Sequence, residues 1–175
     1  PAENMPADPK FSASRRSFLK LHSQPKVEVI RPPWTDETSM RADCTSCNAC
    51  IDACPETILK SDADGRPMVV FDGRECTFCQ KCAVACEDHV FDLTRDEPWP
   101  LKAEIRQGCL QDQGISCQLC RDSCPQSAIR VDLTKRPFGR LKIDADLCNG
   151  CGACLSTCPQ SVLALKDASL EPEAA

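Results

Sequence analysis

All sixteen cysteines of this chain fall into four groups of four, and none lies outside them. Three groups have the spacing C-x2-C-x2-C-x3-C, the pattern that holds [4Fe–4S] clusters in bacterial ferredoxins. The remaining group, the third, differs only in its first spacing, C-x7-C. At four thiolates per cluster, the pattern predicts four [4Fe–4S] clusters with every cysteine a ligand. The groups are Cys44, Cys47, Cys50 and Cys54; Cys76, Cys79, Cys82 and Cys86; Cys109, Cys117, Cys120 and Cys124; and Cys148, Cys151, Cys154 and Cys158.

Two other interpretations of the cysteines are weaker. A disulfide framework is typical of a short secreted chain, whereas this chain has 175 residues and no evident export segment. Structural zinc sites use two CxxC pairs separated by a spacer, not a triplet followed by C-x3-C. Four such groups in series therefore favour iron–sulfur clusters.

The apolar content is low for a chain that folds by burial alone. Ile, Val, Leu and Phe together number 35, or 20% of the residues, which is at the lower limit for a compact fold. The clusters are therefore expected to supply much of the interior, as metals do in small metal-dependent domains. Without iron, the body of the protein is expected to be largely unfolded.

The chain is predicted to consist of an arm followed by two similar modules. The arm lacks cysteine and periodic pattern, is basic and contains several prolines, which indicates irregular structure. We expect an α+β fold, in which two tandem bacterial-type two-cluster ferredoxin-like modules are built from short strands and helices. The predicted ranges are 1–40 for the arm, 41–95 for the first module, 96–104 for a linker, 105–167 for the second module and 168–175 for a tail.

Each module is expected to follow one plan: a cluster loop, Cys-Pro with a short helix, a turn, a strand and a second cluster loop. Proline suits the first position of a helix, where no backbone donor is needed. Asp64-Gly65 is typical of a hairpin turn. Short apolar or alternating runs predict strands over 68–71, 129–133 and 141–143.

The pairing of the groups is not determined by spacing, because successive groups are 22, 23 and 24 residues apart. Pro98-Trp99-Pro100 interrupts the middle connection and favours pairing the first group with the second and the third with the fourth. In two-cluster ferredoxins the fourth cysteine of a run ligates the other cluster. The predicted ligand sets are Cys44, Cys47, Cys50 and Cys86; Cys76, Cys79, Cys82 and Cys54; Cys109, Cys117, Cys120 and Cys158; and Cys148, Cys151, Cys154 and Cys124.

Two groups depart from the common pattern. Glu87 follows the second group where the others have proline. Its charge would lower the potential of the cluster held by Cys86, although glutamate is also simply acceptable in a first helical turn. The third group contains the insertion 110–116, which is expected to bulge outward and leave its cluster more exposed.

The arm contains the sequence SRRSFLK at residues 14–20, which matches a twin-arginine export signal. A signal also needs an apolar stretch of about 7–15 residues, and here His22 to Lys26 are polar or proline. Two interpretations remain open: imitation of a signal for a protein that binds such signals, and a solvated basic turn without a special role. A helical turn is expected near 15–21.

Several classes of function are disfavoured. Residues 41–175 contain fifteen basic and twenty-one acidic side chains, and the chain has no tyrosine, which is unfavourable for binding nucleic acid. The two histidines, His22 and His89, lie in no recognisable acid–base constellation, so an enzyme is not expected. No apolar run approaches the about 18 residues of a transmembrane segment.

With its four ferredoxin groups, widened third group, Arg15-Arg16 and Arg31-Pro32-Pro33-Trp34, the chain resembles the ferredoxin-type NapF family of the periplasmic nitrate reductase system. The resemblance covers nearly the whole chain. It implies a cytoplasmic protein with four [4Fe–4S] clusters, ligated by the sixteen cysteines. It also implies binding to the precursor of the nitrate reductase catalytic subunit and assistance in its maturation before export.

A second interpretation of the same clusters remains open. The chain would then be an electron-transfer polyferredoxin subunit that connects a redox donor to an acceptor within a redox complex. Both interpretations use the same ligands, so the residues alone do not separate them.

Overall fold

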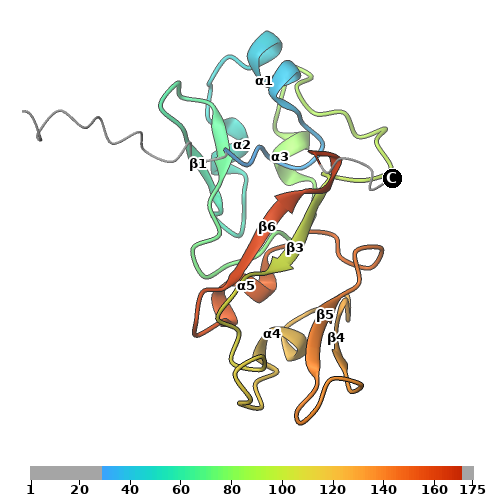
Figure 1. The fold of residues 1–175 in the computed structure, drawn as a ribbon. Helices are drawn as coiled ribbons and strands as arrows, with labels where there is room; N and C mark the ends of the chain where they lie inside the picture. The colour runs from blue at the N-terminus through green and yellow to red at the C-terminus, as the bar shows by residue number, and fades with distance from the viewer. Residues whose placement is uncertain (1–28, 171–175) are drawn as a thin grey trace, which may run out of the picture.

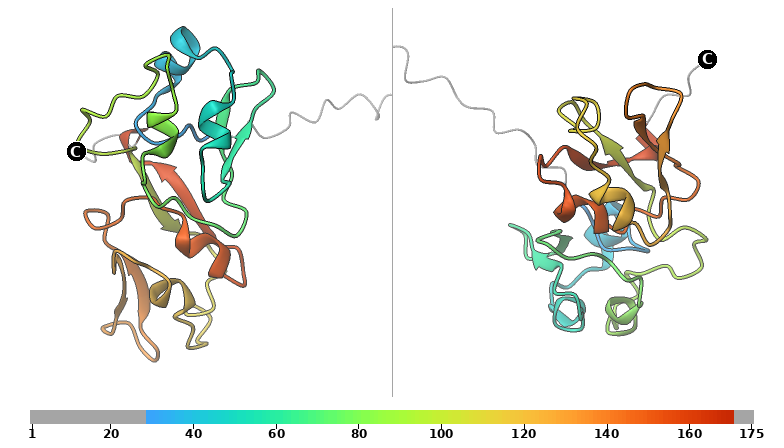
Figure 2. Two further views of the ribbon diagram at one scale, coloured as in Figure 1. Left: turned by 180° about the vertical axis from the view of Figure 1, so that it is seen from behind. Right: turned by 90° about the horizontal axis from the view of Figure 1, so that it is seen from below.

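The structure, a computed structural model, describes residues 29–170, which form two modules toward opposite ends of the molecule with one strand pair running between them (Figure 1). The views from behind and from below show the same division (Figure 2). The Arg15-Arg16 motif and the helical turn expected near 15–21 lie outside the described residues. Within 29–170, no helix combines the length and the apolar character needed to cross a membrane.

The first module contains three short helices and one hairpin. Its elements are α1 (Glu37–Asp43), α2 (Ala49–Asp52), β1 (Leu59–Ser61), β2 (Pro67–Val69) and α3 (Lys81–Val84). The strands are antiparallel, with Leu59 opposite Val69. The predicted strand over 68–71 therefore begins one residue earlier and ends sooner, and its partner β1 was not predicted.

The second module contains two antiparallel strand pairs. Its elements are β3 (Leu101–Ile105), α4 (Leu119–Asp122), β4 (Ile129–Asp132), β5 (Arg140–Ile143), α5 (Ala153–Thr157), β6 (Leu163–Asp167) and the 3-10 helix η2 (Ala168–Leu170). β4 pairs with β5 and β3 pairs with β6. The strands expected near 129–133 and 141–143 are thus present as the β4–β5 hairpin.

The β3–β6 ribbon joins the two modules. Residues 101–104, which the sequence analysis placed in a linker, form most of β3 and pair with β6. Just before β3, Trp99 is buried in the core of the first module, whereas Ala103 belongs to the core of the second. The connection is therefore a continuous packed strand.

The segment 29–40, predicted as the end of an irregular arm, is part of the folded first module. Pro32 and Met40 are fully buried, and Trp34 is only 6% exposed. The Arg31 side chain forms ion pairs with Asp62 and Glu37, each at 2.7 Å. Burial of these apolar groups and of a paired guanidinium stabilises the segment, whose last four residues begin α1.

The expected helix after each Cys-Pro is a turn. In the first module the helix α2 precedes Cys54, and Thr57 then takes a φ of +52° and donates its N–H to the Cys54 carbonyl at 3.1 Å. Ser127 and Ser161 repeat this geometry after their own cysteines. The hydrogen-bonded turn redirects the chain and satisfies the cysteine carbonyl, so proline marks a turn here.

Candidate metal centres

Four small cavities lie in the interior, and each is lined by four cysteines. The volumes are equal, at about 20 Å³ each, which is expected for four copies of one kind of group. The first cavity is lined by Cys44, Cys47, Cys50 and Cys86; the second by Cys54, Cys76, Cys79 and Cys82; the third by Cys109, Cys117, Cys120 and Cys158; and the fourth by Cys124, Cys148, Cys151 and Cys154.

The structure thus brings together the same cysteines that the crossed pattern grouped. Within residues 29–170, no set of three or more Cys, His, Asp or Glu side chains is arranged to hold a single metal ion. The four sulfurs of each set instead surround a space, as a multi-atom cluster requires. Cavities lined by four thiols and little polar surface fit [4Fe–4S] clusters, whose ligands are cysteine thiolates.

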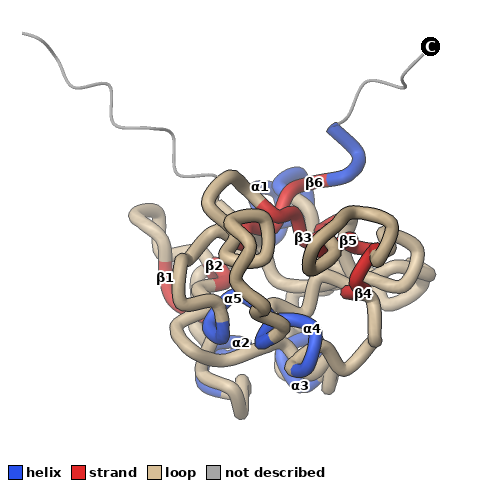
Figure 3. The backbone as a smooth tube through the Cα atoms, turned by 60° about the horizontal axis from the view of Figure 1, so that its bottom comes forward, coloured by secondary structure: helices blue, strands red, loops and turns tan. Residues whose placement is uncertain are grey.

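Short helices place one cysteine at each of two neighbouring cavities. Cys50 on α2 lines the first cavity, and Cys54, one turn later, lines the second. α3 does the same with Cys82 and Cys86, and α4 and α5 repeat the arrangement in the second module. These four helices gather below the strands in the view of Figure 3.

Left-handed backbone conformations shape the tight loops of groups one, two and four. In the first group Ser46 and Asn48 have φ values of +58° and +66°, and in the second Phe78 and Gln80 have +52° and +61°. Gly150 and Gly152 occupy the same places in the fourth group. Because non-glycine residues rarely adopt positive φ, this repeated strain is a cost that the wrapped centre must offset.

The cavities disfavour thiolates unless a cation is present. Burial, followed by the charges of neighbouring cysteines, raises the pKa of Cys50 and Cys154 to about 12. Burial likewise raises the pKa of Cys76 to about 11, against an opposing hydrogen bond from the Phe78 backbone. Near neutral pH these groups would hold protons, which iron must displace when the clusters assemble.

The inserted loop of the third group is fixed to the rest of the module, so the expectation of a more exposed site is wrong. Cys109 is buried and Cys117 is half-buried, whereas the exposed cysteines are Cys47 and Cys79 in the first module. Gln111, only 2% exposed, accepts a hydrogen bond from the Cys117 backbone at 2.9 Å and donates one to the Phe138 carbonyl.

The insertion is also held by charge. Arg140 on β5 donates two hydrogen bonds to the Asp112 carboxylate, at 2.9 and 3.0 Å. A glutamine with two fixed partners and a bidentate ion pair therefore replace the tight wrap seen in the other groups. Only the spacing of the group could have been read from the sequence, because these partners lie 27 or 28 residues away or are backbone atoms.

Gln111→Leu is expected to loosen the third centre. The change keeps the size of the side chain but leaves a part-buried N–H and a part-buried carbonyl without partners, which costs about 1–3 kcal/mol. Iron release to a chelator from the anaerobic holoprotein is expected to be about tenfold faster for the affected cluster. The measurement is the decay of cluster absorbance with time.

Gln113→Leu is the matched control for this change. Gln113 lies in the same loop, is exposed, and donates to the Gly108 carbonyl at 3.0 Å. Its loss leaves groups that water can reach, so iron release is expected to stay within about twofold of the original protein. Equal rates for the two variants would contradict the role given to Gln111.

The second cavity has a cover that the cysteine pattern did not predict. Pro33 and Trp34 line it together with Cys54, and Trp34 contacts Phe78 edge-to-face with ring centroids 6.2 Å apart. The Trp34 carbonyl accepts a hydrogen bond from the Asp92 backbone N–H at 2.8 Å. The pair of prolines with an adjacent tryptophan was a sequence signal for burial, although no periodicity indicated it.

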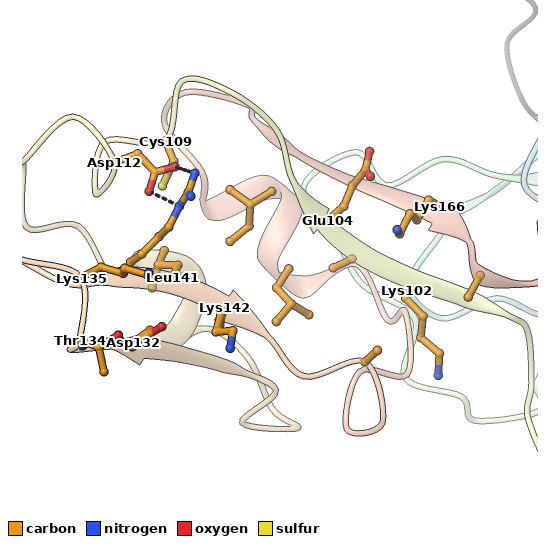
Figure 4. A pocket seen from close by; sticks show the side chains of 16 residues that line it. Lys102, Glu104, Cys109, Asp112, Asp132, Thr134, Lys135, Leu141, Lys142 and Lys166 are labelled. Atoms are coloured by element: carbon orange, nitrogen blue, oxygen red, sulfur yellow. Dashed lines mark hydrogen bonds and ion pairs between the residues drawn. The ribbon is translucent and has the colours of Figure 1, made fainter. Parts of the chain in front are cut away.

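A hollow with a volume of about 670 Å³ lies beside the third cavity, between β3 and β5 (Figure 4). Half of its lining residues are charged, including Lys102 and Glu104 on β3 and Lys142 on β5, and Cys109 lies at one side. The Arg140–Asp112 pair closes the end next to Cys109. The third centre is therefore the one adjoining a polar surface depression.

His89 takes the same turn position as Thr57, with a φ of +55°, and is exposed. His89 therefore has a place in the turn after the second group that does not require it to bind a metal. Glu87 is exposed, whereas Asp88 lines the first cavity and accepts a hydrogen bond from Thr45 at 2.6 Å. The effect of Glu87 on a cluster potential stays a prediction.

Comparison with known proteins supports the content of these cavities. The family described as the 4Fe-4S dicluster domain matches twice, over residues 43–90 and 115–162. Two dicluster domains correspond to four [4Fe–4S] clusters, in agreement with the sixteen cysteines and four cavities.

Matches along most of the chain are found among curated proteins. The ferredoxin-type protein NapF of Escherichia coli K12 is 40% identical over 155 residues, covering 88% of this chain and 94% of the relative. NapF of Haemophilus influenzae is 41% identical, covering 90% and 89%. The methylamine utilization ferredoxin-type protein MauM of Methylobacillus flagellatus is 30% identical, covering 86% and 72%.

Proposed function

This chain belongs to the NapF family of ferredoxin-type proteins and holds four [4Fe–4S] clusters, and we propose that it assists maturation of a nitrate reductase. Its client would be the precursor of the catalytic subunit of periplasmic nitrate reductase, bound in the cytoplasm before export. The observation behind this proposal is the identity of 40% to a NapF protein over nearly the full length of both chains.

The described residues support the proposal through the four cysteine-lined cavities. We infer that the four cysteines of each cavity are the ligands of one cluster, so each module has crossed ligation. When bound, each cluster supplies a one-electron redox centre. The protein's own part is to orient four thiolates, to exclude water with apolar walls, and to place backbone donors near sulfur, as with the Ala103 N–H at 3.3 Å from Cys148 Sγ.

Deletion of the gene separates maturation from electron supply. Under the proposal, nitrate reductase activity in the deletion strain falls even when a viologen dye supplies the electrons, because the catalytic subunit itself is incomplete. The intact gene restores the activity. Activity that is lost only with the natural donor would contradict the proposal and favour the electron-transfer subunit.

A direct binding test complements the deletion. The anaerobic holoprotein with a purification tag is expected to retain the catalytic precursor from cytoplasmic extract, and not the mature subunit from periplasmic extract. Apoprotein prepared in parallel is the control for nonspecific capture. Absence of precursor from the bound fraction in cells that contain it would count against the client proposed here.

A further inference from the structure

The two modules meet through the loops that carry two of the cluster sites. The backbone N–H of Cys76, at the second cavity, donates to the carbonyl of Cys151, at the fourth, at 2.8 Å. The Trp99 indole N–H donates to the Asn149 carbonyl in the same fourth-group loop, also at 2.8 Å. Cysteine-bearing segments of different modules are therefore in direct backbone contact.

The contact is too close for a side chain to fit between the loops. A Cβ at Gly152 would lie 2.4 Å from two ring carbons of Phe71, and a Cβ at Gly150 would lie 2.7 Å from Nε1 of Trp99. Phe71 contacts Trp99 edge-to-face, with centroids 6.2 Å apart. Aromatic side chains of the first module thus pack against glycine backbone of the second.

Within each module the two cavities are already linked by helices. α2 and α3 each carry one cysteine at one of the first two cavities and are each followed, four residues later, by a cysteine at the other, and α4 and α5 repeat this for the third and fourth. α2 contacts α3, and α4 contacts α5. The contact between Cys76 and Cys151 adds the connection between the modules.

We propose that the four clusters form one linear electron relay in the order first, second, fourth, third, and that Gly152 is the residue that holds the middle two in register. At each step one cluster loses an electron and its neighbour gains it, and no bond or proton is exchanged. The relay requires the four clusters but not the nitrate reductase client, so its test is independent of the maturation proposal.

The order has a structural consequence for where electrons enter and leave. The two middle clusters face each other across the junction, so the end positions belong to the first and third. The first centre has the exposed ligand Cys47, although the second also has one, Cys79. The third lies beside the charged hollow between β3 and β5 (Figure 4). A donor and an acceptor would therefore use opposite modules.

Magnetic coupling between reduced clusters tests the order. The anaerobic holoprotein is reduced fully with dithionite, and its EPR spectrum and spin-relaxation rates are analysed for interactions between neighbouring paramagnetic clusters. The relay predicts three pairwise interactions: one inside each module and one across the junction. A spectrum that is described completely by two separate pairs would overturn the proposal.

Gly152→Ala and Gly73→Ala form a matched pair of variants. Both glycines have positive φ, +86° and +74°, so alanine strains the backbone similarly at each. Only Gly152 has a close neighbour, because nothing lies within 4 Å of a Cβ at Gly73. We expect Gly152→Ala to lose the interaction across the junction while keeping both interactions inside the modules.

Iron content decides how the variant is interpreted. Gly152→Ala with about sixteen irons and all three interactions unchanged would overturn the positioning role of Gly152. If this variant loses iron, it is not interpreted. The number of magnetic interactions in the unmodified protein then distinguishes one relay of four clusters from two separate pairs. Gly73→Ala is expected to keep about sixteen irons and three interactions, and loss of the junction interaction in it would contradict the assignment.

Discussion

Removal of the iron is expected to unfold most of residues 29–170. Cysteines supply three of the six buried residues in the core cluster of the second module and one of five in the first. A structural metal contributes about 10 kcal/mol to a small domain, comparable with the whole stability of a typical domain, about 5–15 kcal/mol. The free energy of folding lost with four clusters therefore exceeds the stability that the apolar contacts alone provide.

Tryptophan emission provides the measurement. Trp34 and Trp99 are each 6% exposed, and both lie next to the second centre or its aromatic neighbours. Anaerobic oxidation with ferricyanide in the presence of EDTA should shift their emission to longer wavelength and remove resistance to protease. Reconstitution with ferrous iron and sulfide should restore both. A compact, protease-resistant apoprotein would show that the polypeptide folds without the clusters.

The cysteine groups could be predicted because their information is local. Groups one, two and four each fix three sulfurs within seven residues, and in every group the helix at the third cysteine moves the fourth to the neighbouring cavity. The turn after Cys54 could not be recognised, because proline is equally suited to a first helical position. The hydrogen bond from Thr57 to Cys54 and the positive φ at Thr57 show a turn and not a helix, and both are features of the folded chain.

The parts that the sequence did not reveal depend on distant partners. β3 and β6 are five residues each and lie about sixty residues apart. β3 (LKAEI) alternates strictly between apolar and polar residues but directly follows Pro98-Trp99-Pro100, which favoured a linker, and β6 (LALKD) does not alternate. The segment around Arg31 and Trp34 has no periodicity, and its burial follows from contacts with Asp62 and Phe78. The composition of this segment is typical of an irregular tail, although most of its apolar side chains are buried and its charged side chains form ion pairs.

Crossed ligation is expected to appear as a difference between two double variants. Cys47→Ala with Cys86→Ala removes two ligands from the first cavity and none from the others, so three intact clusters should remain. Cys47→Ala with Cys54→Ala removes one ligand from each of two cavities, so only two should remain intact. Mössbauer spectroscopy of anaerobically purified protein counts intact clusters, and iron analysis gives about twelve irons for the first variant.

The second module provides an independent replicate of this comparison. Cys117→Ala with Cys158→Ala should leave three intact clusters, whereas Cys117→Ala with Cys124→Ala should leave two, because Cys158 and not Cys124 lies at the third cavity. If ligation followed the chain, the two results would be exchanged in both modules. The reversal distinguishes connectivity from general loss of stability, since each pair of variants removes the same number of cysteines from the same module.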